Sequence, residues 1–380
     1  MLKKYYAKNL ISNLSRHSVN VNMNITNGDQ QMKIAMLHGQ WAQNIGNAFF
    51  NLGGEYIFEN AAPSASIFRI MDQPNYRTLH NKFKGNPDTF WDPIANIDTD
   101  LVVLQGPVLN AWFPLSWEKT IKALHARGAG YALHSCSFFK FTETEFTTVH
   151  HFLEKYPPLF ISTRDSNAYE KIKSWGLDTP LIDGIDAGFF VNKAYTPPHL
   201  YEDEKVVTFN FDRYPEPNLS EDPHGLISIS DRSYKLQSPR LLQKYSAQSK
   251  VRAYLGELFD NRQLPQKLGP YKIIRPEHRF FPHVTKKIYK RPAAYASDEP
   301  YTYLTNYANS VLTLSDRVHA CVATLAYGGS AMLFTPSPRA GLFERIGASN
   351  IKREPTSITK SELEQQQDKH IEAIRAVLTT

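Results

Sequence analysis

The stretch SVLTLSDRVHACVATLAYGG at residues 310–329 decides the fold class. Its first part, residues 310–314, is a short apolar run typical of a buried strand. A polar turn follows, and residues 317–327 then have the small apolar side chains typical of a helix packed closely on a sheet, ended by the glycine pair at 328–329. Another apolar run begins at residue 331. A strand, a helix and a strand in succession predict parallel strands joined by a helical crossover.

The same alternation extends along most of the chain and forms two series. Strands are expected at residues 32–38, 100–106, 130–134, 159–164, 179–183, 205–210, 271–275, 310–314 and 331–334. Helices are expected from residue 48 and at residues 117–127, 165–175, 243–258, 300–308, 317–327 and 359–377, the last opened by a Thr-x-x-Glu capping box. A polar, proline-bearing stretch at residues 193–204 separates the two series.

These elements predict an α/β protein with two doubly wound, Rossmann-like domains that face a cleft. The expected division is a polar extension at residues 1–31, an N-terminal domain at 32–195, a C-terminal domain at 196–347 and a helical tail at 348–380. Ligands of such folds bind at the carboxyl ends of parallel strands, so polar residues that follow a strand are the first candidates for a site.

Composition limits the class of protein and its partners. Of the 380 residues, 42% are hydrophobic and 21% are charged, which is sufficient for two globular cores. The net charge of +6 favours anionic partners. However, the basic residues are scattered along the chain and form no recognisable nucleic-acid-binding module, so no nucleic-acid partner is expected. Two cysteines, and a sequence without a long apolar run or signal-peptide pattern, predict a cytoplasmic protein, with peripheral contact to the inner membrane left open.

The turn at residues 315–319 contains the residues with the clearest chemical potential. Arg317 and His319 are expected at the N-terminus of a helix, where backbone N–H groups and the helix dipole favour an anion. The Arg317 guanidinium would match a phosphate or carboxylate, and His319 could donate a proton beside it. A salt-bridged arginine and an ordinary satisfied histidine are the structural alternative, which is the commoner one for such a short motif.

Three segments of the chain carry a family resemblance through their order and spacing. They are HGQWAQNIGN at residues 38–47, ISTRDS at 161–166 continued by LIDGIDAGF at 181–189, and DRVH at 316–319 with the small-residue helix after it. Together they resemble the polysaccharide pyruvyl transferase family, from about residue 32 to residue 347. The resemblance implies a fold similar to that of two-domain GT-B glycosyltransferases.

The resemblance also implies a reaction. The donor would be phosphoenolpyruvate, and the product would be a pyruvate ketal that bridges two hydroxyls of a sugar, with release of phosphate. His319 would then be the acid that protonates the methylene carbon of the donor, and Arg317 would contact the donor's anionic groups. The resemblance implies neither a cofactor nor a metal ion.

Two further arginines match donor-binding positions of the family. Arg164 belongs to the middle segment and would hold the donor from the N-terminal domain, although its position also suits an ion pair with Asp165 or Glu170. Arg339 stands where the family usually has a lysine, so the charge is kept while the geometry changes from a point donor to a fork. A surface arginine at a helix start is the alternative for Arg339.

A second group of residues is expected to line the cleft or the acceptor site. Its members are Asn44, Gly46, Asn47, Gly106, His134 and His278. Asn47 replaces the aspartate with which the family's first loop usually ends, which removes a negative charge. Four of them have a structural alternative: a helix cap for Asn47, a turn for Gly106, loop packing for His278 and, for His134, a buried core position, which is the commoner one for such a histidine.

The leading interpretation is therefore a pyruvyltransferase that acts on a sugar of a polysaccharide or of its lipid-linked glycan precursor. A glycosyltransferase that uses a nucleotide sugar in the same kind of cleft is the second interpretation. A non-catalytic glycan-binding protein of the same fold is the third. The acceptor sugar and the oligomeric state do not follow from the sequence.

Overall fold

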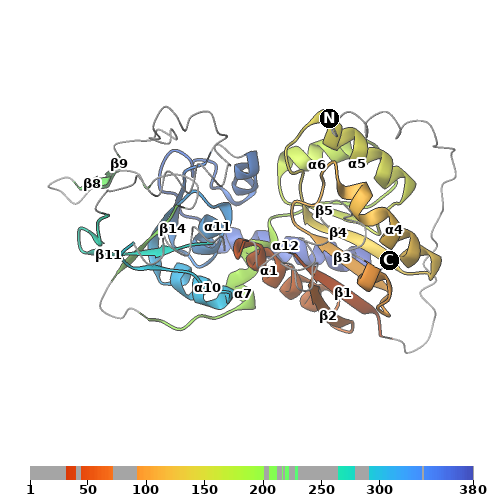
Figure 1. The fold of residues 1–380 in the computed structure, drawn as a ribbon, viewed down its shortest axis with the longest axis horizontal. Helices are drawn as coiled ribbons and strands as arrows, with labels where there is room; N and C mark the ends of the chain where they lie inside the picture. Colours follow the sequence, from red (N-terminus) through yellow and green to blue (C-terminus); the bar gives the residue numbers. More distant parts are fainter. Residues whose placement is uncertain are drawn as a thin grey trace.

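The computed structural model describes residues 31–39, 44–71, 92–200, 205–211, 216, 219–221, 227–229, 264–278, 291–335 and 338–379. The described elements form two lobes, each built on its own parallel sheet, with helices between them (Figure 1). No described helix is long and apolar enough to cross a membrane.

The N-terminal lobe contains a six-stranded sheet in the order β2-β1-β3-β4-β5-β6, and every neighbouring pair is parallel. Its strands are β1 (Lys33–His38), β2 (Ser66–Met71), β3 (Leu101–Gln105), β4 (Gly130–Cys136), β5 (Ile161–Thr163) and β6 (Leu181–Asp183). Successive side chains of β1 alternate between the two sides of the sheet: Ile34 and Met36 join one apolar cluster, and Ala35 and Leu37 join another. Both faces of this sheet are therefore buried, as a doubly wound fold requires.

Helices cover both faces of the N-terminal sheet. They are α1 (Gly46–Ala61), α3 (Asp92–Ala95), α4 (Phe113–Ala126), α5 (Glu143–Lys155), α6 (Ser166–Lys173), the 3₁₀ helix η2 (Ala187–Phe190) and α7 (Val191–Ala194). Helix α1 packs very closely on η2, because a side-chain carbon at Gly53 would overlap the carbonyl oxygen of Ala187. This close approach fixes the bend just before η2, which reaches the site described below.

The C-terminal lobe has a sheet in the order β10-β11-β7-β13-β14, with β12 paired to β11. Its strands are β7 (Val206–Asn210), β10 (Lys267–Leu268), β11 (Tyr271–Pro276), β12 (Ala294–Tyr295), β13 (Ser310–Ser315) and β14 (Ser330–Leu333). Within the described part of this sheet, β10 pairs with β11 in antiparallel fashion and the other neighbouring strands are parallel. A separate antiparallel pair is formed by β8 (Leu219–Glu221) and β9 (Ile227–Ile229). Helices α10 (Pro300–Ala308) and α11 (Val318–Ala326) pack on one face of the large sheet.

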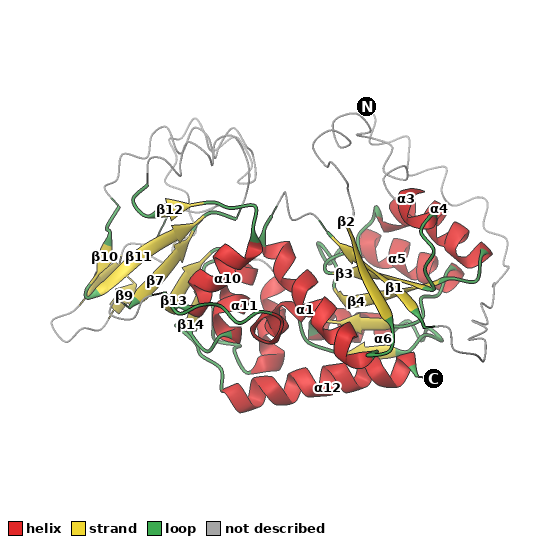
Figure 2. Cartoon of the chain, turned by 90° about the horizontal axis from the view of Figure 1, so that it is seen from below, coloured by secondary structure: helices red, strands yellow, loops and turns green. Residues whose placement is uncertain are grey.

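Helices join the two lobes. One apolar cluster includes residues of α1, η2, α10 and α11, so the core is continuous from one lobe to the other. The chain then runs through the 3₁₀ helix η4 (Pro338–Ile346) to α12 (Lys360–Leu378), which returns along α1 to the N-terminal lobe (Figure 2). Thr359 caps α12, and its hydroxyl accepts a hydrogen bond from the N–H of Glu362 at 3.3 Å. The helix cap expected at this position is therefore present, and Oε2 of Glu362 accepts a hydrogen bond from the Thr359 hydroxyl at 2.6 Å.

The alternation of strands and helices is confirmed in both lobes. The sequence pattern did not indicate β2 or α5, and α1 begins at Gly46, two residues before the expected start. The helix expected at residues 243–258 lies outside the described residues.

Candidate active site

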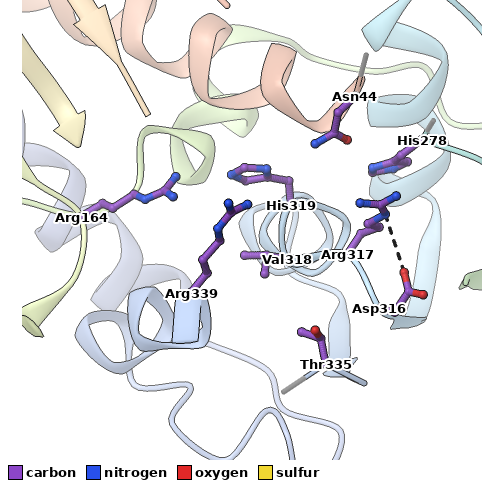
Figure 3. Close-up of a pocket in the computed structure, with 9 residues that line it drawn as sticks. All are labelled: Asn44, Arg164, His278, Asp316, Arg317, Val318, His319, Thr335 and Arg339. Carbon is purple, nitrogen blue, oxygen red and sulfur yellow. Dashed lines mark ion pairs between the residues drawn. The ribbon is translucent and has the colours of Figure 1, made fainter. Parts of the chain in front are cut away.

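A pocket lies between the two lobes at the carboxyl ends of their strands (Figure 3). About 470 Å³ of space lies within it, part of it open to solvent. The residues that line it are Asn44, Arg164, His278, Asp316, Arg317, Val318, His319, Thr335 and Arg339. The first two come from the N-terminal lobe and the others from the C-terminal lobe, so the pocket needs both.

The turn between β13 and α11 presents most of the pocket's polar groups. The hydroxyl of Ser315 accepts a hydrogen bond from the N–H of Arg317 at 2.8 Å, which holds Arg317 in an extended conformation before the helix begins. Behind this turn Ala320 and Ala323 are fully buried and let α11 lie close to the sheet. The first N–H groups of α11 thus lie at the pocket, where a helix favours an anion.

Three arginines contribute positive charge to this pocket. Arg164 and Arg317 are almost fully buried, whereas Arg339 is half-buried, with its guanidinium 4.8 Å from the ring centroid of Phe139. Figure 3 shows Arg164 and Arg339 extending toward His319, with Arg317 on the other side of that histidine. Nε of Arg317 is 3.7 Å from Oδ1 of its neighbour Asp316. The cations therefore outnumber the carboxylates among the pocket-lining residues, which suits an anionic ligand.

Asp186 lies behind the pocket; it belongs to the family-like segment at residues 181–189 but is not among the site residues expected from the sequence. It is fully buried, and Nη1 of Arg164 donates a hydrogen bond of 2.9 Å to its Oδ2. Nε2 of His319 lies 3.7 Å from the same oxygen. Burial opposes ionisation of Asp186, but Arg164 and His319 outweigh it and hold the pKa of this carboxyl well below its usual range.

His319 stands at the centre of these charges, with its ring packed 5.3 Å from that of Phe50. Burial lowers the pKa of His319; Asp186 opposes that change, whereas Arg164 and Arg339 add to it. The net effect of these groups favours the neutral imidazole. An anion bound among the arginines would offset their repulsion and favour the protonated form.

Four of the expected cleft residues lie at or beside the pocket. Asn44 and His278 line it, and Gly46 and Asn47 form the first turn of α1 directly beside them. Asn47 is not the helix cap, because Ile45 holds the cap position. Instead, Oδ1 of Asn47 accepts a hydrogen bond from Nδ2 of Asn44 at 3.3 Å. His278 links the lobes, since its carbonyl accepts the N–H of Ile45 at 3.1 Å.

The other two expected cleft residues do not line the pocket. Gly106 forms the turn after β3 with a φ of 82°, and a side chain there would collide with the ring of Phe50. His134 is fully buried inside the N-terminal lobe, where its Nε2 lies 3.3 Å from Nε2 of His370 in α12. The expectation that His134 faces the cleft is thus corrected, because α12 covers it.

The partner of Arg164 also differs from the local alternative. Asp165 caps α6 by accepting a hydrogen bond from the N–H of Ala168 at 2.8 Å, and Arg164 instead pairs with Asp186, which is distant in sequence.

Across the described ranges, His, Cys, Asp and Glu side chains do not gather in groups of three or more that could hold a metal ion.

Comparisons with known proteins agree with this architecture. The model of the polysaccharide pyruvyl transferase family matches residues 44–338. Among solved structures, the chain is similar to the S. aureus MnaA-UDP co-structure, with 10% identity, coverage of 90% of this chain and 91% of that chain, and a TM-score of 0.50. It is also similar to UDP-GlcNAc 2-epimerase from Neisseria meningitidis bound to UDP-GlcNAc. That match has 8% identity, covers 92% of this chain and 98% of that chain, and has a TM-score of 0.48.

At such low identity the first of these structures supports the fold alone, a GT-B-like pair of Rossmann-like domains, which confirms the expected fold class. A search of curated proteins finds no significant match.

Proposed function

The chain belongs to the polysaccharide pyruvyl transferase family, and from this membership we propose that it transfers the enolpyruvyl unit of phosphoenolpyruvate to a sugar. The proposed acceptor is a sugar of a polysaccharide or of its lipid-linked precursor. The product is a pyruvate ketal that bridges two sugar hydroxyls, and phosphate is released.

The observation that carries the proposal is the position of His319 among three arginines. Phosphoenolpyruvate has a phosphate and a carboxylate on adjacent positions of one small molecule, and its charges need several cations at short range. Arg164, Arg317 and Arg339 supply them from both lobes. The N-terminus of α11 adds N–H donors at the same place.

In the proposed reaction the donor's charge favours protonated His319, which gives its proton to the methylene carbon of the donor. The central carbon becomes electron-poor and is attacked by the first sugar hydroxyl, whose proton is lost as the C–O bond forms. The second hydroxyl then replaces the phosphate at the same carbon. Of the two protons released by the hydroxyls, one balances the proton now in the methyl group and the other leaves on the phosphate.

The acceptor is proposed to enter beside the first turn of α1. Asn44 lines the pocket and Asn47 follows it on the same turn, so both could offer amide groups to sugar hydroxyls. An uncharged asparagine at position 47 recognises a hydroxyl without the repulsion that a carboxylate would exert on an anionic sugar.

The test is an assay with phosphoenolpyruvate and a panel of sugar acceptors, read by phosphate release and by mass. The proposal expects both signals together, dependent on the acceptor and lost in His319→Gln. A parallel arm supplies nucleotide sugars in place of phosphoenolpyruvate. Glycosyl transfer in that arm would instead support the glycosyltransferase, and binding of glycans without turnover in either arm would support a non-catalytic glycan-binding protein.

A further inference from the structure

Asp186 connects the two lobes at the pocket. It belongs to the bend between β6 and η2 in the N-terminal lobe, whereas His319 belongs to α11 in the C-terminal lobe. Its Oδ2 accepts the hydrogen bond from Arg164 and faces Nε2 of His319, and its Oδ1 accepts the N–H of Gly188 at 2.8 Å. One buried carboxylate therefore contacts a donor-binding arginine and the proposed acid at once.

The bend that contains Asp186 is held from two other directions. The N–H of Ile185 donates to Nδ1 of His370 in α12 at 3.1 Å, and the N–H of Ala187 donates to the hydroxyl of Ser135 at 2.9 Å. Ser135 has a φ of 49°, in the left-handed region that a serine rarely adopts, at the point where β4 shifts register against β5. Strain of this kind persists where the surrounding structure requires it. The carboxylate of Asp186 is therefore fixed in place.

The contact with Asp186 also distinguishes the two ring nitrogens of His319. Nε2 is buried and is the nitrogen that faces the carboxylate. In histidine–carboxylate pairs the nitrogen on the carboxylate side is held, and the other one exchanges the proton with the substrate. In this site the second nitrogen is Nδ1.

We propose that Asp186 is the positioning residue of this site, which orients His319 so that Nδ1 delivers the proton while the same carboxylate holds Arg164. The inference rests on the proposed function for its catalytic part, and on the geometry alone for the pairing of Asp186 with His319. Because the carboxylate and the imidazole come from different lobes, the acid is complete only when the lobes are arranged as observed.

The pairing makes a prediction about the titration of His319. Among the described residues, Asp186 favours the protonated form of this imidazole, and Arg164 and Arg339 disfavour it. Asp186→Asn should therefore lower the pKa of His319, and Arg164→Gln should raise it. Asp183→Asn is the matched control, since Asp183 is three residues away, half-exposed and paired with Arg345 outside the pocket.

The experiment is an NMR titration of histidine-labelled protein, in which the His319 signal is identified by its loss in His319→Gln. The inference expects a lower pKa in Asp186→Asn, a higher one in Arg164→Gln and no change in Asp183→Asn. A His319 pKa that is the same in Asp186→Asn and the wild type would overturn it. If Asp186→Asn does not fold, an unchanged His319 pKa in Arg164→Gln overturns it equally.

Turnover separates this inference from the proposed function. With phosphoenolpyruvate and an active acceptor, Asp186→Asn should lower kcat by roughly 100-fold, an effect in the range of general acid catalysis. In the pH profile of kcat, the activity of Asp186→Asn should also begin to fall at a lower pH than that of the wild type. If the wild-type protein shows no turnover with any acceptor of the panel, the proposed function is contradicted. The NMR titration then remains the decisive test of the pairing of Asp186 with His319. Turnover of Asp186→Asn at the wild-type rate and pH dependence would overturn the catalytic part of the inference.

Discussion

Gly46, in the first turn of α1, lies against His319, at the start of α11. A side-chain carbon placed on Gly46 would stand 3.2 Å from Cβ of His319 and 3.3 Å from Nδ1 of His278. Such contacts are tighter than most in proteins, so the neighbours would have to move. The smallest residue at this position thus lets the N-termini of helices from the two lobes approach each other beside the pocket.

Gly46→Ala should therefore impair the site more than the fold. Alanine is the better helix former, so the melting temperature should change little or rise. The displaced His319 should lower kcat/KM by roughly tenfold, about 1.4 kcal/mol of transition-state stabilisation. Steady-state assays together with thermal unfolding check this. Gly341→Ala is the control, because a side chain there would meet nothing closer than 3.8 Å; equal losses in both variants would contradict the prediction.

His319→Gln should abolish most of the turnover while it preserves donor binding. The glutamine keeps a polar group of similar size but cannot supply the proton, so kcat should fall by about 10²–10⁴-fold. The dissociation constant for phosphoenolpyruvate should change by only about threefold, since an acid acts mainly in the transition state. Calorimetry and initial rates measure the two quantities separately. Turnover near the wild-type rate would remove His319 from its role.

Arg317→Lys should weaken donor binding although the charge is kept. A lysine is a point donor and cannot reproduce the planar fork of the guanidinium. The loss of a charge-assisted hydrogen bond, about 1.5–3 kcal/mol, corresponds to a roughly 10–100-fold higher dissociation constant for phosphoenolpyruvate. Titration calorimetry checks this. As a control, Arg353→Lys replaces an arginine beyond η4, outside the pocket, and should leave the affinity unchanged.

Most of the fold follows from local sequence, because buried parallel strands are continuous apolar runs bounded by turns. The run at residues 101–105 is an example, and all five of its residues are buried. The sequence does not indicate strand β2, because SIFRIM at residues 66–71 is neither a continuous apolar run nor a regular alternation of apolar and polar residues, and it includes Arg69. That arginine is accommodated by an ion pair with Glu55 of α1, a contact that a single segment does not indicate.

The site was only partly predictable for a related reason. Arg317 and His319 sit at a strand–helix junction, a position that the sequence pattern itself marks. Asp186 stands in the LIDGIDAGF segment between Ile185 and Ala187, and its importance comes from contacts with Arg164 and His319, which are distant in sequence. The position of His134 near a strand end suggests a place at the cleft, but α12 returns to cover it.

The covered histidines give a prediction about stability. His370 of α12 lies 3.3 Å from His134 and 3.2 Å from the hydroxyl of Ser162, and its Nδ1 accepts the N–H of Ile185. An accepting nitrogen must carry no proton, so this network requires a neutral His370. Burial, supported by Arg345, lowers the pKa of His370 to about 4. Burial and the neighbouring His370 also lower the pKa of His134.

Acid should consequently destabilise the docking of α12. Between the usual pKa of histidine and the lowered one, the unfolded chain binds a proton that the folded protein does not, so stability is complete at higher pH and is lost as pH falls. From about pH 7 to about pH 5, His370 alone should cost about 2 kcal/mol. Urea unfolding at the two pH values measures this. His370→Gln, whose amide oxygen can still accept a hydrogen bond, should reduce the pH dependence of stability. His151→Gln, on the exposed side of α5, should not change it. The same pH dependence in the wild type and in His370→Gln would refute the role of His370 in acid destabilisation.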